Sequence, residues 1–171
     1  MRVITAHEPL DLKNDEIAVF LAGGITDCPD WQKEVINFFR YRDTEANLVL
    51  LNPRRDNFPI NDPDATEEQI TWEFNALERM DIFSMYFCSG TSDQPICMYE
   101  LGRNICRMQM RFPTDWEDRI VVSVEEGYRR FRDVVIQTDL ATKELCTPNM
   151  IRTGNVTKHI KDILDAYTML K

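Results

Sequence analysis

Glu73 and Glu100 lie in one stretch of the chain, residues 70–106, and paired carboxylates are the simplest equipment for cleaving a glycosidic bond. The hydrophobic pattern of this stretch predicts an amphipathic helix, a short buried strand, a polar loop and a second helix. Ligands of open α/β sheets bind beyond the C-terminal ends of the strands, where such loops meet. Glu100, in the first turns of the second helix, is therefore expected to face a pocket, and Glu73 on the preceding helix is expected to share it.

Each glutamate also has an ordinary structural interpretation. For Glu100 it is an interaction with the helix dipole, as is common for a glutamate in the first turn of a helix. For Glu73 it is that of a solvated residue on the helix surface. Gly102 favours a function for Glu100, because a glycine inside a helix costs about 1 kcal/mol relative to alanine and suggests the close approach of another backbone or a ligand. The helix N-terminus is also expected to lower the pKa of Glu100 and keep it ionised, as a carboxylate nucleophile requires.

Other candidates lie in loops expected at the same edge of the sheet. Asp93 follows a buried strand and either reaches a ligand or caps the next helix. Arg54 and Arg55 follow another strand and either form an anion site or are surface arginines. Gly23 and Gly24 allow close backbone approach or positive φ, although they lack the spacing of dinucleotide-binding and P-loop motifs.

Strands alternating with helices must position these residues. Apolar runs without alternation, at 17–25, 48–51, 82–88 and 120–124, predict strands buried on both faces, and residues 1–5 predict an edge strand. Helices are predicted at 31–41, with Asp30 as N-cap, and at 66–80, 96–110, 129–143 and 155–170, whereas 147–154 is expected to be irregular. The pattern indicates a single domain, residues 1–171, with a flavodoxin-like three-layer α/β sandwich and four or five parallel strands.

Composition narrows the classes of partner. The 171-residue chain has a formal net charge of −9, which argues against nucleic-acid polymers and anionic membranes as partners. The N-terminus is too acidic for a signal peptide, no apolar run could span a membrane, and a cytoplasmic location is expected. Five scattered cysteines and two distant histidines, His7 and His159, give no metal-ligand spacing, so neither a metal nor a cofactor is predicted.

Taken together, several motifs make the chain resemble the nucleoside 2-deoxyribosyltransferase family over roughly residues 17–140. The order and spacing of the motifs are more specific than any one of them. They are FLAGGI at 20–25, DWQ at 30–32, NPRR at 52–55, WE at 72–73 with Asp81, and YELG at 99–102. NPRR and YELG indicate one branch of the family.

This resemblance implies a mechanism. Family members attack the anomeric carbon with the glutamate of the ELG motif, here Glu100, and form a covalent deoxyribosyl-enzyme that a second base or water then resolves. Glu73 takes the place of the carboxylate that holds or protonates the base. A family aspartate six residues before the nucleophile is replaced by Gln94, and Asp93, one residue earlier, is the alternative acid.

The same resemblance implies substrate-binding residues and partners. Gly23, Gly24 and Ile25 are expected to approach the sugar through their backbone, near Gly102 and the arginines of the NPRR motif. The other candidates, which would line the mouth of the pocket or stack on the base, are Asp27, Trp31 and Trp72. The partners implied are a nucleoside or nucleotide, a nucleobase, and further copies of the chain in a homo-oligomer.

Two alternatives to sugar transfer remain open. The first is an N-glycosidase that hydrolyses a nucleoside 5′-monophosphate, with Thr26, Ser92, Arg54 and Arg55 available to bind the phosphate. The second is a nucleotide-binding sensor without turnover, for which a poised pair of carboxylates would have no use.

Overall fold

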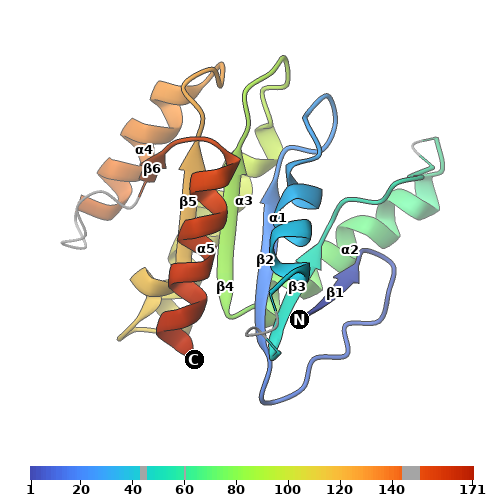
Figure 1. The fold of residues 1–171 in the computed structure, drawn as a ribbon. Helices are drawn as coiled ribbons and strands as arrows, with labels where there is room; N and C mark the ends of the chain where they lie inside the picture. Colours follow the sequence, from blue (N-terminus) through green and yellow to red (C-terminus); the bar gives the residue numbers. More distant parts are fainter. Residues whose placement is uncertain (43–45, 60, 144–150) are drawn as a thin grey trace.

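Over the described residues, one parallel sheet of six strands forms the centre of the molecule (Figure 1). The structure, a computed structural model, describes residues 1–42, 46–59, 61–143 and 151–171. Along the sheet the order is β1-β3-β2-β4-β5-β6, and every pairing is parallel. The strands are β1 (Arg2–Thr5), β2 (Ile17–Gly23), β3 (Leu48–Asn52), β4 (Ile82–Phe87), β5 (Ile120–Val124) and β6 (Ile151–Thr153).

Helices cover both faces of the sheet, which gives the predicted three layers. Helices α1 (Trp31–Arg40) and α5 (Val156–Leu170) pack on the face toward the viewer in Figure 1. Behind the sheet lie α2 (Pro63–Arg79), α3 (Pro95–Arg111) and α4 (Phe131–Lys143), and the short 3₁₀ helix η1 (Trp116–Arg119) precedes β5. From β2 onward the strand order is that of a flavodoxin-like fold, so this prediction is confirmed.

The number of strands is higher than the predicted four or five. Part of the stretch expected to be irregular forms β6, whose three residues pair with Val122, Ser123 and Val124 at the edge of the sheet. Two of its three residues are exposed, so it lacks the continuous apolar run that identified the central strands. Gly154 is irregular as predicted, and residues 147–150 lie outside the described residues.

Helix starts follow their capping residues. Asp30 accepts a hydrogen bond from the backbone N–H of Lys33, as predicted. Helix α2 begins at Pro63 and not at 66, because Asp62 caps it and proline suits the first helical position. Helix α3 begins at Pro95, and its N-cap is Gln94 rather than Asp93.

The chain order places a crevice at the C-terminal ends of the central strands. From β2 the chain crosses to β3 on one side, and β4 adds to the other side of β2, so the connections diverge at this point. Along β2, Phe20 and Ala22 face the layer of α2 and α3, whereas Val19 and Leu21 face α1 and α5. The loops after β2, β3 and β4 therefore meet beside the layer that holds both glutamates.

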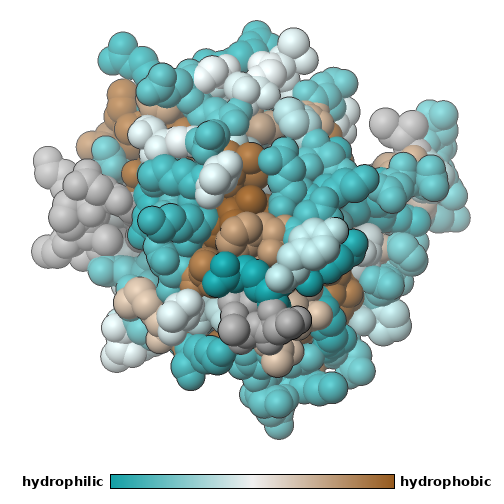
Figure 2. Space-filling model, in the orientation of Figure 1, coloured by the Kyte–Doolittle hydropathy of each residue, from teal (hydrophilic) through white to brown (hydrophobic). Residues whose placement is uncertain are grey.

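The surface on the α1 and α5 side is mostly hydrophilic, with a strip of apolar surface between these two helices (Figure 2). Within the described part of the chain, no helix combines the length and the apolar character needed to cross a membrane.

Candidate active site

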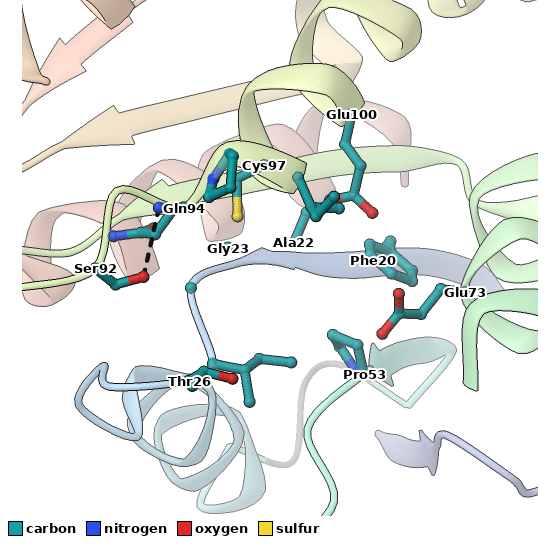
Figure 3. A pocket seen from close by; sticks show the side chains of 14 residues that line it. Phe20, Ala22, Gly23, Thr26, Pro53, Glu73, Ser92, Gln94, Cys97 and Glu100 are labelled. Atoms are coloured by element: carbon teal, nitrogen blue, oxygen red, sulfur yellow. Dashed lines mark hydrogen bonds between the residues drawn. The ribbon is translucent and has the colours of Figure 1, made fainter. Parts of the chain in front are cut away.

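A cavity of about 230 Å³ opens at the C-terminal ends of β2, β3 and β4 (Figure 3). Its walls combine two carboxylates with hydroxyl, amide, thiol and apolar groups and, in the part of the chain that the structure describes, include no lysine, arginine or histidine. The lining residues are Phe20, Ala22, Gly23, Gly24, Ile25, Thr26, Pro53, Glu73, Ser92, Gln94, Pro95, Ile96, Cys97 and Glu100. All of them lie within residues 20–100, on β2, α2 and α3 or on the loops that follow β2, β3 and β4.

Glu73 and Glu100 share this cavity, as the sequence predicts. Glu73 extends from α2 and Glu100 from α3, and in Figure 3 the two carboxyl groups approach the cavity from different sides, near Phe20. Each is largely buried, and each carries a raised pKa. The cavity therefore holds two acidic groups whose ionised forms are disfavoured by burial and, for Glu100, also by the charge of Glu73.

Burial raises the pKa of Glu100 to about 7, the neighbouring Glu73 adds to the rise, and Arg103 opposes it. This corrects the expectation that the helix N-terminus lowers the pKa. Pro95 is the first residue of α3, so Glu100 lies in the second turn, beyond the range over which a helix end acts strongly. The pKa of Glu73 is also raised by burial. Below about pH 7 the pair therefore retains a proton, and attack by the Glu100 carboxylate requires that this proton lie on Glu73.

Gln69, which the sequence analysis missed, holds Glu73 in place. Its Nε2 donates to Glu73 Oε1 at 2.7 Å and to the carbonyl of Pro53 at 2.7 Å. The hydrogen bond favours the ionised form of Glu73 and so opposes the effect of burial on its pKa. The i, i+4 spacing of Gln69 and Glu73 on one helix face was the available signal.

Two adjacent glycines are required where the backbone of β2 turns into the cavity wall. A Cβ at Gly23, whose φ is +150°, would lie 2.4 Å from the carbonyl oxygen of Tyr86 and 2.7 Å from the Trp31 ring. A Cβ at Gly24 would lie 2.4 Å from Cys28 Sγ. The predicted close approach thus occurs, and it is made by other residues of the protein. It lets residues 23–26 pack tightly as one wall of the cavity.

Gln94 stands at the other end of the cavity from the glutamates. Its φ is +46°, and its Nε2 donates to the carbonyl of Cys88 at 3.0 Å, which leaves the buried Oε1 without a partner among the described residues. Ser92 Oγ accepts from the N–H of Gln94 at 3.4 Å. Cys97 lies one helical turn before Glu100, and burial raises the pKa of its thiol, which is therefore neutral at physiological pH.

The two predicted tryptophans support the cavity from behind and do not line it. Trp31 is 1% exposed, packs on Tyr86 with ring centroids 5.2 Å apart, and donates from Nε1 to the carbonyl of Gly24 at 3.1 Å. Trp72 is buried beside Phe20 and donates from Nε1 to the carbonyl of Glu8 at 2.8 Å. Both belong to the core that fixes the walls.

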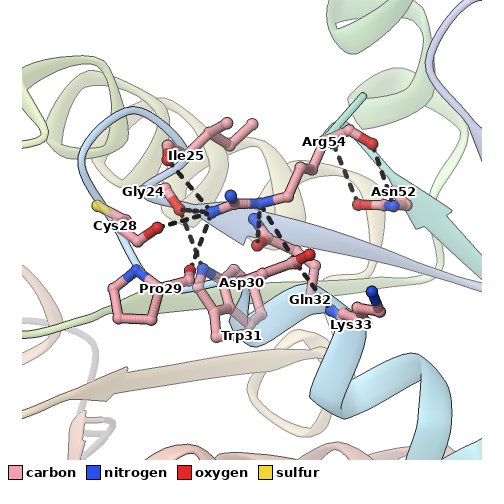
Figure 4. A network of polar contacts seen from close by, with 10 residues as sticks. All are labelled: Gly24, Ile25, Cys28, Pro29, Asp30, Trp31, Gln32, Lys33, Asn52 and Arg54. Carbon is pink, nitrogen blue, oxygen red and sulfur yellow. Dashed lines mark hydrogen bonds and ion pairs between the residues drawn. The ribbon is translucent and has the colours of Figure 1, made fainter. Parts of the chain in front are cut away.

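The predicted arginines and aspartates lie outside the lining. Arg54 donates to backbone carbonyls of the loop after β2 (Figure 4), and Arg55 lies 3.9 Å from Glu68. The Asp93 carboxylate is 3.5 Å from Arg129, and Asp27 is an exposed residue with φ +57°. The NPRR motif contributes Pro53 to the cavity and uses Arg54 for contacts within the chain.

Gly102 lies on the exposed side of α3. No atom of the described residues lies within 4 Å of a Cβ placed there, apart from the neighbours along the helix itself. The close approach expected at this glycine is therefore absent among the described residues. Within the described ranges, no cluster of three or more His, Cys, Asp or Glu side chains could hold a metal ion.

A comparison with protein families gives a match to a family described as nucleoside 2-deoxyribosyltransferase like, over residues 16–114. This range begins just before β2, ends just after α3 and includes every residue that lines the cavity. A search of curated proteins finds no match.

Proposed function

Because the chain belongs to the nucleoside 2-deoxyribosyltransferase-like family, we propose that it cleaves the N-glycosidic bond of a (deoxy)nucleoside and transfers the sugar to another nucleobase. The observation that supports this most directly is the pair of buried carboxyl groups, Glu73 and Glu100, in one cavity. A displacement at the anomeric carbon needs a carboxylate nucleophile and an acid for the leaving base, and the pair provides both.

In the first step a carboxylate oxygen of Glu100 attacks C1′ of the sugar. The C1′–N bond breaks, its electron pair stays on the base nitrogen, and the base takes a proton from Glu73. Positive charge that develops at C1′ is stabilised by the Glu100 carboxylate before the bond forms. The product is a free base and a deoxyribosyl ester of Glu100.

In the second step the acceptor base attacks C1′ from the side that the first base has left. Its nitrogen forms the new C1′–N bond, the ester bond breaks, and the electron pair returns to Glu100. The proton that the acceptor base loses goes to Glu73, which restores the starting state. Water in place of the acceptor base would give hydrolysis.

The charge of the cavity supports a neutral nucleoside in preference to a 5′-monophosphate. The described residues of the lining include two acidic groups and no cationic side chain, so a phosphate dianion would be repelled there. Nη2 of Arg54 already bonds to the loop after β2 and its Nε to Gln32 of α1, and Arg55 lies beside Glu68. Thr26 and Ser92 can bond equally well to a sugar hydroxyl.

The test is a product analysis of the purified protein with a panel of deoxynucleosides, each with and without a second nucleobase, and with the matching 5′-monophosphates. The proposal expects a new nucleoside only when the second base is present. Release of free base from the monophosphates and from no deoxynucleoside would reject transfer in favour of the hydrolase.

Glu100→Gln should lower turnover by about a thousandfold or more and keep nucleoside affinity, because the nucleophile is lost and the cavity is kept. Nucleoside binding without turnover by the unmodified protein would favour the sensor.

The homo-oligomer that the family resemblance implies is also proposed. Apolar side chains stand exposed on α2 and α3, and one of them, Ile96, both lines the cavity and is 65% exposed. Contiguous exposed apolar groups are typical of interfaces. The others are Ile70, Phe74, Tyr99 and Met110. Sedimentation analysis should give more than one subunit, and Tyr99→Glu should weaken the assembly, whereas Leu140→Glu on α4 should not.

A further inference from the structure

Arg54 lies outside the cavity, yet it contacts much of the loop that forms one cavity wall (Figure 4). Its Nη2 lies within hydrogen-bond distance of four backbone carbonyl oxygens of that loop. They are Pro29 at 2.9 Å, Ile25 at 3.2 Å, Gly24 at 3.3 Å and Cys28 at 3.5 Å. The two hydrogens of Nη2 are therefore shared among carbonyls that surround the guanidinium group.

The remaining contacts connect Arg54 to the start of α1. Its Nε donates to Gln32 Oε1 at 2.9 Å and lies 3.4 Å from Asp30 Oδ1. Asp30 is the N-cap of α1, and Gln32 is completely buried. The guanidinium group thus joins the loop to the first turn of the helix that follows it.

Arg54 is itself held at its backbone. Asn52 Oδ1 accepts from the N–H of Arg54 at 3.1 Å, and Asn52 Nδ2 donates to the carbonyl of Arg54 at 3.2 Å. This pair of bonds fixes the turn at the end of β3, so the Arg54 side chain starts from a defined position. The next residue back, Pro53, lines the cavity and accepts from Gln69.

The loop needs such a partner because its carbonyls converge. Asp27 has φ +57°, and Gly24 through Pro29 turn several carbonyl oxygens toward one point. Converging carbonyl dipoles repel one another unless a donor lies between them, and a charged donor forms stronger bonds than a neutral one. Without Arg54, the backbone of Gly24, Ile25 and Thr26 would lose the constraint that shapes the cavity wall.

We infer that Arg54 is a positioning residue that holds the loop of residues 24–29 in its substrate-binding shape. This inference rests on the proposed function for its effect on nucleoside binding. Glu73 and Glu100 stand on α2 and α3, and among the described residues no hydrogen bond or ion pair joins these helices to the Arg54 guanidinium, so their chemistry is not disturbed directly. Loss of Arg54 weakens the binding of the substrate in the ground state and in the transition state by the same amount, so KM rises and kcat changes little.

The side chain must be an arginine. A lysine ammonium is a compact, strongly hydrated charge, whereas the planar guanidinium places Nε toward Gln32 and Nη2 toward the loop at the same time. Arg54→Lys keeps the charge and loses this geometry. It should therefore resemble Arg54→Ala in substrate binding and fold more readily.

The experiment measures amide hydrogen exchange and steady-state kinetics on three variants of the full chain. Arg54→Lys and Arg54→Ala are expected to exchange faster at residues 24–29 and to raise the KM for the nucleoside about tenfold or more, with kcat within about threefold. The control is Arg2→Lys. Arg2 also ties a loop to the sheet, with both Glu16 carboxylate oxygens 2.7 Å away, but at the amino end of the strands. It should leave KM and exchange at residues 24–29 unchanged.

An unchanged KM in both Arg54 variants overturns the inference, even if exchange at the loop is faster. Equal rises in KM for Arg2→Lys and Arg54→Lys also overturn it, because the effect would then be general loss of stability. If the unmodified protein turns over no nucleoside, the proposed function fails. The exchange comparison, which needs no substrate, still decides whether Arg54 holds the loop.

Discussion

At the scale of single residues, the acidity of Glu100 is set by its surroundings and not by its helix. Burial and the nearby Glu73 raise its pKa to about 7, against the effect of Arg103. Two acidic groups that share a poorly hydrated cavity cannot both ionise easily. A pair with one proton is the form that the proposed reaction requires.

The pH profile of kcat/KM should therefore fall on both sides of an optimum. Above about pH 7 the pair loses its last proton and has none for the leaving base, and at low pH both groups are protonated and no nucleophile remains.

In Glu73→Gln the negative charge that raises the Glu100 pKa is gone, so this pKa falls. The variant, although slower, should keep its activity as the pH rises through 7. The measurement is kcat/KM across the pH range for both proteins, and a decline near pH 7 that persists in Glu73→Gln contradicts the shared proton.

At the scale of elements, Gly23 and Gly102 differ in whether their surroundings leave room for a side chain. Gly23, at the end of β2, has positive φ and no room for a Cβ beside the Tyr86 carbonyl. Gly102, inside α3, faces open space. A glycine in an exposed helix interior lowers stability relative to alanine, whereas one in a left-handed position next to backbone cannot be replaced cheaply.

Gly102→Ala should therefore raise the free energy of unfolding by up to about 1 kcal/mol, because alanine loses less backbone entropy on folding and meets no neighbour. Gly23→Ala, as the contrasting variant, should lower it by more than that. The measurement is the thermal unfolding midpoint of each variant, compared with that of the unmodified protein at equal protein concentration. A lower midpoint for Gly102→Ala would mean that another subunit packs against this glycine.

Elements that bury a continuous apolar run were predictable, and elements that depend on their neighbours were not. Such runs predict strands β2 to β5, and Asp30 predicts the start of α1. Strand β6 has three residues, two of them exposed, and exists because Val122–Val124 of β5 offers it a pairing edge. The lining residues Phe20 and Ala22 follow from strand alternation once the direction of the core is known.

Within the candidate site, the same limit applies. The pairing of Glu73 with Glu100 follows from sequence order and sheet topology, and the sequence predicts it. The use of Arg54 for loop carbonyls depends on the path of a loop with Asp27 at positive φ, and no local pattern reveals that path. Asp93 and Asp27 have suitable side chains, but their positions in the folded loops turn them away from the lining.

At the scale of the whole molecule, a buried histidine joins α5 to the centre of the sheet. His159 Nε2 lies 2.8 Å from Ser84 Oγ on β4, and its Nδ1 lies 2.8 Å from Ser123 Oγ on β5. Burial lowers the pKa of His159 to about 3, with a smaller contribution from Lys158. The imidazole is thus neutral in the folded protein, and one of its two nitrogens donates while the other accepts.

This arrangement should make the fold sensitive to acid. The unfolded chain takes up a proton on His159 near its ordinary pKa of about 6.5, but the folded chain does so only near 3, so stability falls as the pH falls from 6.5 toward 3. The slope from this residue is about 1.4 kcal/mol per pH unit at most. Urea unfolding at several pH values should show that His159→Gln removes this part of the slope. Equal slopes in both proteins would contradict the neutral, buried imidazole.

The central claim is that Glu100 forms a covalent bond to the sugar. The direct measurement is peptide mass spectrometry after the protein has been mixed with a deoxynucleoside and quenched in acid, with no acceptor base present. The account predicts the mass of one deoxyribosyl group on the peptide that contains Glu100, its loss when an acceptor base is added before quenching, and its absence in Glu100→Gln. Turnover with no adduct on that peptide, or an adduct that persists in Glu100→Gln, would contradict it.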